Sequence, residues 1–235
     1  MAATALIRMR NIHFSFVKER PVLRGANLDV FAGEKIALSG PNGAGKTTLI
    51  HAMMGLIRIT SGEIDIFGKP CRNEDDFRAI RGRVGLLFQD SDDQLFCPTV
   101  LEDVAFGPLN LGHTPLDADQ IARRILAELG LEGFEDRITY QLSGGEKRLV
   151  ALATVLAMEP EVLLLDEPTN GLDVHVEHRL TGILKNLPQA MVIISHDRNF
   201  LDQVATRTVK LSSGQITDQI SKSGCTSRAK KQDTQ

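Results

Sequence analysis

Residues 40–47 read GPNGAGKT, and this stretch is the most informative in the chain. It fits the pattern GxxxxGK[ST], in which a glycine-rich loop joins a strand to a helix and surrounds phosphate groups. The residues before it, Lys35–Ser39, form a mostly apolar run typical of a strand, and residues 46–54 have helical spacing. This context favours a phosphate-binding loop over an ordinary glycine turn followed by a surface lysine.

The loop carries the residue types that a nucleoside triphosphate requires. Glycines let the backbone turn its N–H groups toward phosphate without a clash from Cβ. Lys46 is expected to reach the β- and γ-phosphates, and the Thr47 hydroxyl to bind Mg²⁺. The predicted ATP contacts in this segment are Gly40, Pro41, Asn42, Gly43, Ala44, Gly45, Lys46, Thr47 and Thr48.

Two adjacent acids follow the apolar run at residues 162–165. Asp166 ends the predicted strand, at the edge where open α/β sheets bind ligands, and is expected to hold Mg²⁺ directly or through water. Glu167 faces the other way, because adjacent strand residues alternate, and is expected to polarise the attacking water. Taken alone, the pair could simply end a strand. Combined with the phosphate loop, it indicates hydrolysis.

A third motif, LSGGE, occupies residues 142–146 and precedes a predicted helix. Ser143 can cap that helix, and the two glycines expose backbone N–H groups. By itself the motif is only a helix start. The order of the motifs along the chain is more informative. It resembles the order in the ATP-binding cassette (ABC) family over residues 6–215: the phosphate loop, Gln89, LSGGE, Asp166–Glu167 and then Ser195-His196-Asp197.

That resemblance implies roles for further residues. Phe16 matches the aromatic residue that stacks on adenine. Gln89 matches the glutamine that senses Mg²⁺ and the γ-phosphate, and His196 matches the switch histidine. LSGGE matches the signature motif, with glutamate where many members have glutamine. The resemblance therefore implies Glu167, His196 and Gln89 as catalytic residues, and Thr47, Gln89 and Asp166 as the Mg²⁺ site.

The family mechanism implies a head-to-tail dimer. Each ATP would lie between Lys46 of one chain and the signature motif of the other, and residues 170–173 would form the D-loop. Hydrolysis would remove the phosphate charge that holds the dimer closed. The contacts implied across the dimer are Ser143, Gly144, Gly145, Glu146 and Asp173.

The expected fold is an α/β P-loop cassette with a RecA-like core, an antiparallel β subdomain and a helical subdomain at about 90–160, all within residues 1–220. Residues 221–235 are polar and basic and are expected to be disordered, with contact to anionic lipid as the alternative. Strands are expected at 6–9, 28–30, 35–39, 63–67, 84–88, 162–166, 190–195 and in a pair near 207–219. Helices are expected at 46–54, 75–81, 99–106, 117–130, 145–158 and 174–185.

The segment 89–108 resembles the ATPases of energy-coupling-factor importers, most closely those of the cobalt and nickel branch, with biotin-type vitamin importers as the alternative. The implied partners are a second ATP-binding subunit, identical or different, a transmembrane coupling protein and a substrate-binding membrane protein. The implied location is the cytoplasmic face of the cell membrane, where the chain is peripheral. The coupling protein is expected to dock on the apolar residues of this segment, with Asp90–Asp93 beside them. These apolar residues are Leu95, Phe96, Val100, Val104 and Phe106. The alternative is that they pack the interior of the subdomain.

Composition narrows the alternatives. The formal net charge of −3 argues against nucleic acid as the main partner. The sequence has three scattered cysteines with no CxxC pair and no apolar run near the roughly 20 residues of a membrane helix, so another chain must supply any membrane passage. Two other hypotheses remain: a soluble ABC ATPase without a membrane partner, and a nucleotide-binding regulator that does not hydrolyse ATP. Intact Glu167 and His196 count against the second.

Overall fold

The computed structural model describes residues 4–17 and 19–219. Within them, the chain forms a six-stranded sheet in the order β10-β9-β3-β8-β7-β6 and a four-stranded antiparallel sheet in the order β2-β1-β4-β5. The neighbours from β9 to β6 pair in parallel, and β10 closes the edge as an antiparallel hairpin with β9. The strands of the larger sheet are β3 (Lys35–Ser39), β6 (Val84–Leu87), β7 (Val162–Asp166), β8 (Ala190–Ile194), β9 (Arg207–Ser212) and β10 (Gln215–Gln219).

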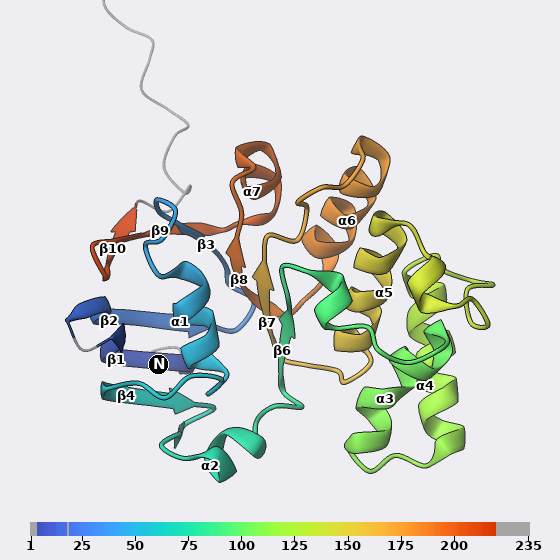
Figure 1. The fold of residues 1–235 in the computed structure, drawn as a ribbon, viewed down its shortest axis with the longest axis horizontal. Coiled ribbons are helices and arrows are strands. Elements are labelled where there is room, and N and C mark those ends of the chain that lie inside the picture. The colour runs from blue at the N-terminus through green and yellow to red at the C-terminus, as the bar shows by residue number, and fades with distance from the viewer. Residues whose placement is uncertain (1–3, 18, 220–235) are drawn as a thin grey trace, which may run out of the picture.

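The smaller sheet and the helices flank this core. The strands of the smaller sheet are β1 (Ala5–Val17), β2 (Arg20–Phe31), β4 (Ser61–Ile66) and β5 (Lys69–Pro70). The helices are α1 (Lys46–Met53), α2 (Glu74–Arg78), α3 (Val100–Asn110), α4 (Pro115–Glu128), α5 (Gly144–Leu156), α6 (Val174–Asn186) and α7 (Arg198–Val204), with short 3₁₀ turns η1 (Ser91–Asp93) and η2 (Thr139–Gln141). Figure 1 shows the four-stranded sheet at one end of the molecule and α3 with α4 at the other.

The strands β3, β6, β7 and β8 are buried on both faces, which explains why they read as nearly continuous apolar runs. Side chains alternate along each strand, so Val162 and Leu164 of β7 pack with α1 and the four-stranded sheet. Leu163 and Leu165 pack on the opposite face, with the helices α5 and α6. This layering places α1 and α5 on opposite sides of the sheet, with the phosphate loop and Asp166 at the same edge.

The expected fold class and most of the expected elements are confirmed. The first hairpin is much longer than the short strands predicted at 6–9 and 28–30, because it pairs along Ala5–Phe31 with several bulges. The helix predicted at 75–81 begins at Glu74 and ends at Arg78, since Asn73 and Asp76 form a capping box there. The helix α7 was missed. The predicted tail at 221–235 lies outside the described residues.

Candidate functional site

The phosphate loop leaves β3 and turns sharply into α1. Gly45 precedes the helix with a φ of 97°, and a Cβ there would lie 2.7 Å from Val22 Cγ1. Gly40 is equally restricted, because its Cβ would lie 2.2 Å from the carbonyl oxygen of Leu211. The loop therefore needs glycine at both places to close against its neighbours.

The side chain of Lys46 points back toward the start of this loop. Its side chain is largely buried, with 8% of the residue surface exposed, and Nζ donates to the carbonyl oxygens of Gly40 at 3.0 Å and Pro41 at 3.1 Å. These neutral acceptors hold the ammonium group inside the loop without cancelling its charge. The positive charge is thus positioned where the loop would surround phosphate.

Asp166 and Glu167 have different partners, although Glu167 lies just beyond the end of β7, so strand alternation does not set its direction. Asp166 is buried at the end of β7, and its Oδ2 accepts a hydrogen bond of 2.7 Å from Thr47 Oγ1. Glu167 follows the strand with a φ of 48°, and its N–H donates to the Ile194 carbonyl oxygen at 2.9 Å. Its carboxylate lies 3.3 Å from His196 Nε2 and accepts from the His196 N–H, also at 3.3 Å.

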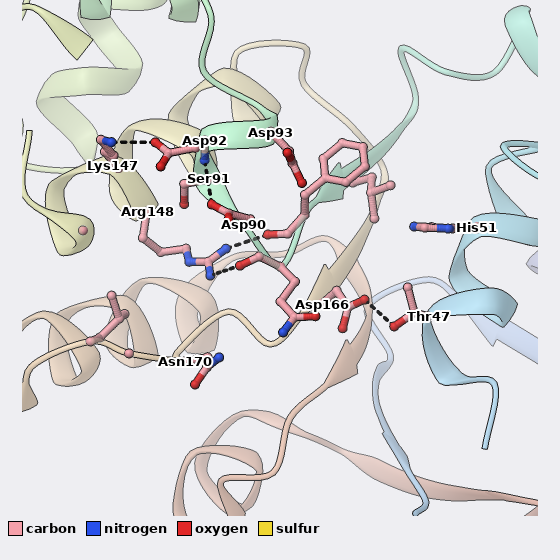
Figure 2. A pocket seen from close by; sticks show the side chains of 16 residues that line it. Thr47, His51, Asp90, Ser91, Asp92, Asp93, Lys147, Arg148, Asp166 and Asn170 are labelled. Carbon is pink, nitrogen blue, oxygen red and sulfur yellow. Dashed lines mark hydrogen bonds and ion pairs between the residues drawn. The ribbon is translucent and has the colours of Figure 1, made fainter. Parts of the chain in front are cut away.

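Two cavities meet at these residues. One, of about 590 Å³, is lined by Phe16, by the phosphate loop with Lys46 and Thr47, and by Gln89, Asp166, Glu167, Asn170 and His196. The other, of about 620 Å³, shares Thr47, Gln89, Asp166 and Asn170 and extends between α1 and α5 (Figure 2). The structure thus brings together the predicted adenine, phosphate, metal and catalytic residues.

The residues predicted to act across a dimer lie elsewhere. Ser143 caps α5, and with Glu146 it forms a capping box in which each side chain accepts from the other's backbone N–H. Bonding to the Ser143 backbone N–H and hydroxyl, reinforced by Arg137, lowers the pKa of Glu146. Asp173 similarly caps α6. Ser143, Gly145, Glu146 and Asp173 line neither cavity, and Gly144 lines only the second.

The predicted docking segment divides into two groups. Leu95, Val100 and Val104 are core residues, so their assignment to a binding surface was wrong. Val100 and Val104 face inward because α3 packs against α4 and α5, and Leu95, just after η1, belongs to the same core cluster. Phe96 and Phe106 are exposed, with 66% of Phe96 accessible, and their rings meet edge to face with centroids 4.8 Å apart.

Sequence reasoning missed Arg148. This residue lies on α5 and is 4% exposed, and its guanidinium donates to the carbonyl oxygens of Phe88 and Gln89, each at 2.6 Å. Burial lowers the pKa of Arg148. The available signal was an arginine directly before the apolar run 149–153, where a surface charge would be unusual.

The parallel sheet and the loop between β3 and α1 define a P-loop nucleotide-binding protein. The family model described as "ABC transporter" matches residues 23–170. The chain belongs to the ABC transporter family, within its ATP-binding components; it binds ATP and is an ATPase.

Individual relatives agree with this family. A protein of Nitratidesulfovibrio vulgaris, named as an ABC transporter ATP-binding protein, is 48% identical over 224 residues, which cover 95% of this chain and 79% of the relative. The energy-coupling factor transporter ATP-binding protein EcfA of Methanothermobacter thermautotrophicus is 43% identical, over 90% of this chain and 69% of the relative.

Solved structures have the same fold. CbiO1 from Clostridium perfringens, described as part of the ABC transporter complex cbiONQ, is 31% identical with a TM-score of 0.80, over 91% of this chain and 87% of that one. The bacterial ABC transporter cassette MJ0796, solved as a dimer, is 27% identical with a TM-score of 0.83, over 93% of this chain and 99% of that one. MJ0796 was also solved in a post-hydrolysis state bound to ADP and Pi.

Proposed function

We propose that this chain is the ATP-hydrolysing subunit of an energy-coupling-factor type importer, working at the cytoplasmic face of the membrane as a peripheral protein. The observation that carries the proposal is one cavity lined by the phosphate loop, Asp166, Glu167 and His196. Gln89 also lines this cavity, and the segment that follows it carries the exposed rings of Phe96 and Phe106. The likeness to EcfA and to CbiO1 supports the importer class. None of the helices in the described residues is long and apolar enough to cross a membrane. The proposed partners are a second ATP-binding subunit, a transmembrane coupling protein and a substrate-binding membrane protein.

Each residue of the cavity has a proposed role. Lys46 binds the β- and γ-phosphates, and Phe16, which is exposed at the mouth of the cavity, stacks on adenine. Glu167 accepts a proton from the attacking water, and His196 beside it orients the carboxylate and contacts the γ-phosphate. Gly40–Thr48 as a whole surrounds the phosphates with N–H groups.

The residues around Thr47 fit a Mg²⁺ ion. Mg²⁺ prefers oxygen ligands, with one or two from protein side chains and the others from phosphate and water. Thr47 Oγ1 and Asp166 Oδ2 lie 2.7 Å apart, and the Gln89 side chain lines the same cavity. We assign these three residues to Mg²⁺, which supplies charge stabilisation to the phosphates when it is bound.

The dimer of MJ0796 supports a head-to-tail dimer of this chain. Ser143 and Asp173 are exposed, and neither they nor Gly144, Gly145 and Glu146 line the cavity that holds Lys46 and Glu167. In the proposed dimer they contact the ATP held by the partner. This arrangement explains why the signature motif does not line the ATP cavity of its own chain: it contacts the nucleotide bound to the other chain.

The transported substrate is proposed to be cobalt or nickel ions, with a biotin-type vitamin as the alternative. This proposal rests on the resemblance of segment 89–108, because neither CbiO1 nor the relatives named EcfA carry a substrate in their names. The cassette does not contact the substrate, so uptake measurements must distinguish the two.

The docking site for the transmembrane coupling protein is proposed at Phe96 and Phe106. The substitution Phe96→Asp is expected to abolish co-purification with the coupling protein and to leave the ATPase activity of the isolated chain within about twofold of wild type, since an exposed side chain contributes little to folding. Gln89→Ala is expected to retain assembly and to uncouple hydrolysis from uptake.

The matched control for Phe96→Asp is Leu116→Asp. Leu116 is equally exposed, at 67%, and lies in the first turn of α4, where an acid is favourable. Leu116→Asp should assemble normally. Normal assembly and uptake by Phe96→Asp would place the docking site elsewhere, and a wild-type chain that hydrolyses ATP but co-purifies with no membrane protein would favour the soluble ABC ATPase.

A further inference from the structure

The segment that follows β6 is attached to α5 by three side chains, Lys147 and Arg148 of the helix and Gln94 of the segment. Lys147 Nζ lies 2.5 Å from Asp92 Oδ1. Arg148 binds the carbonyl oxygens of Phe88 and Gln89, and Gln94 Nε2 donates to the Ala151 carbonyl oxygen and to Thr154 Oγ1, each at 2.8 Å. Figure 2 shows Lys147 and Arg148 reaching from α5 toward this segment.

Arg148 is the central attachment of the three. An exposed ion pair such as Lys147–Asp92 contributes little, because water screens it and both side chains must be ordered. A buried guanidinium with two short bonds is held far more firmly, since its planar fork matches two acceptors at once. The same guanidinium also lies 3.5 Å from the carbonyl oxygen of Glu167. Arg148 therefore contacts the backbone of two residues that face the nucleotide.

The other end of α5 is the signature motif. The helix begins at Gly144 directly after Ser143, less than two turns before Arg148. A helix of 13 residues moves as one body, so a displacement of Gln89 is passed to Ser143 through Arg148. In the proposed dimer, Gln89 senses the chain's own ATP, whereas Ser143 completes the site of the partner.

We propose that Arg148 is a positioning residue that couples the two ATP sites of the dimer, an inference that rests on the proposed function. It holds the γ-phosphate sensor of one site at a fixed distance from the signature motif of the other. Occupation of one site then favours the closed arrangement at both, which makes hydrolysis cooperative in ATP.

The test compares wild type with Arg148→Lys and Arg148→Met in the full-length chain. Lysine keeps the charge but cannot donate to both carbonyl groups in the same geometry. Methionine removes the charge and leaves both carbonyl groups without their donor. The readouts are the thermal midpoint, ATP affinity without Mg²⁺, and the dependence of hydrolysis on Mg-ATP concentration.

The matched control is Lys35→Met. Lys35 is 7% exposed, and its Nζ donates to two carbonyl oxygens, of Leu184 at 2.8 Å and Lys185 at 2.7 Å. It begins β3, at the end of the strand opposite the phosphate loop. Lys35→Met thus reproduces the loss of a buried cation with two carbonyl partners, away from the nucleotide.

Arg148→Lys is expected to keep ATP affinity within about threefold of wild type, since Lys46 and Thr47 are unchanged, and to lower kcat about tenfold. The Hill coefficient should fall from near the two-site limit of about 2 to about 1. Arg148→Lys should recover the thermal midpoint lost in Arg148→Met without recovering cooperativity. Lys35→Met should lose stability but keep the wild-type Hill coefficient and kcat per folded chain.

The inference is overturned if Arg148→Lys hydrolyses ATP with the kcat and Hill coefficient of wild type, or if Lys35→Met changes them equally. If Arg148→Met fails to fold, the kcat and Hill coefficient of Arg148→Lys still test the inference. A Glu167→Gln chain that remains monomeric at saturating Mg-ATP contradicts the proposed dimer itself, and with it the proposed coupling. A different outcome is that wild type and Arg148→Lys hydrolyse ATP with the same cooperativity. This result contradicts the coupling role of Arg148 but leaves the proposed dimer intact.

Discussion

At the scale of single residues, the nucleotide site depends on charges that are held by neutral partners. Lys46 is buried against two carbonyl groups, and Asp166 is buried against a hydroxyl. Such partners fix the position of a charged group and leave its charge available for phosphate or metal. Substitutions that remove the charge should therefore affect binding more than folding.

Lys46→Ala is expected to weaken ATP binding or turnover by at least about tenfold, because hydrogen bonds to a charged group are worth about 1.5–3 kcal/mol. Equilibrium dialysis with ATP and a phosphate-release assay would measure both quantities. Lys69→Ala, at an exposed lysine on β5, serves as the control. Wild-type hydrolysis by Lys46→Ala would contradict the assignment of the phosphate loop.

Residues could be predicted from the sequence where a local motif carries the chemistry. The loop at 40–47 and the acid that ends β7 are such cases, because the order strand, loop, helix is itself part of the pattern. The role of His196 came only from the family resemblance, and its contact with Glu167 was not predicted. Arg148 could not be predicted, because its importance depends on a contact with carbonyl groups about 60 residues earlier in the chain.

At the scale of elements, capping side chains explain where several helices begin. Thr99 and Glu102 form a capping box at α3, and Ser143 and Glu146 form another at α5. The capping role of Ser143 was expected from the sequence, whereas the capping box at Thr99 was not. The helix α7 was missed because it has only seven residues, too few for apolar periodicity, although Asp197 caps it.

Ser143→Ala tests whether the signature serine does more than cap its helix. Removing the cap should destabilise the chain by about 1 kcal/mol, and Thr114→Ala, which removes the cap of α4, should cost about the same. In a Glu167→Gln background, in which ATP is not hydrolysed, only Ser143→Ala is expected to abolish dimerisation in Mg-ATP, as measured by analytical ultracentrifugation. Equal effects of the two substitutions on dimerisation would reduce Ser143 to a structural cap.

At the scale of the whole molecule, one chain would hold halves of two different ATP sites in the proposed dimer. The phosphate loop, Asp166 and Glu167 gather at one edge of the core sheet, whereas Ser143 and Asp173 are exposed at the starts of α5 and α6. The layered fold could be predicted, since its strands and helices follow from apolar patterns. The division of the apolar segment 95–106 between core and surface could not, because it depends on how α3 packs against α4 and α5.

The most direct test of this arrangement is the oligomeric state of Glu167→Gln with and without Mg-ATP. The amide preserves the shape of the carboxylate and its position beside His196, but it cannot accept the proton of water, so hydrolysis should fall by about 100-fold or more. Analytical ultracentrifugation is predicted to find monomers without nucleotide and a stable dimer with two bound ATP at saturating Mg-ATP. A variant that remains monomeric at saturating Mg-ATP and hydrolyses it at the wild-type rate would contradict the account.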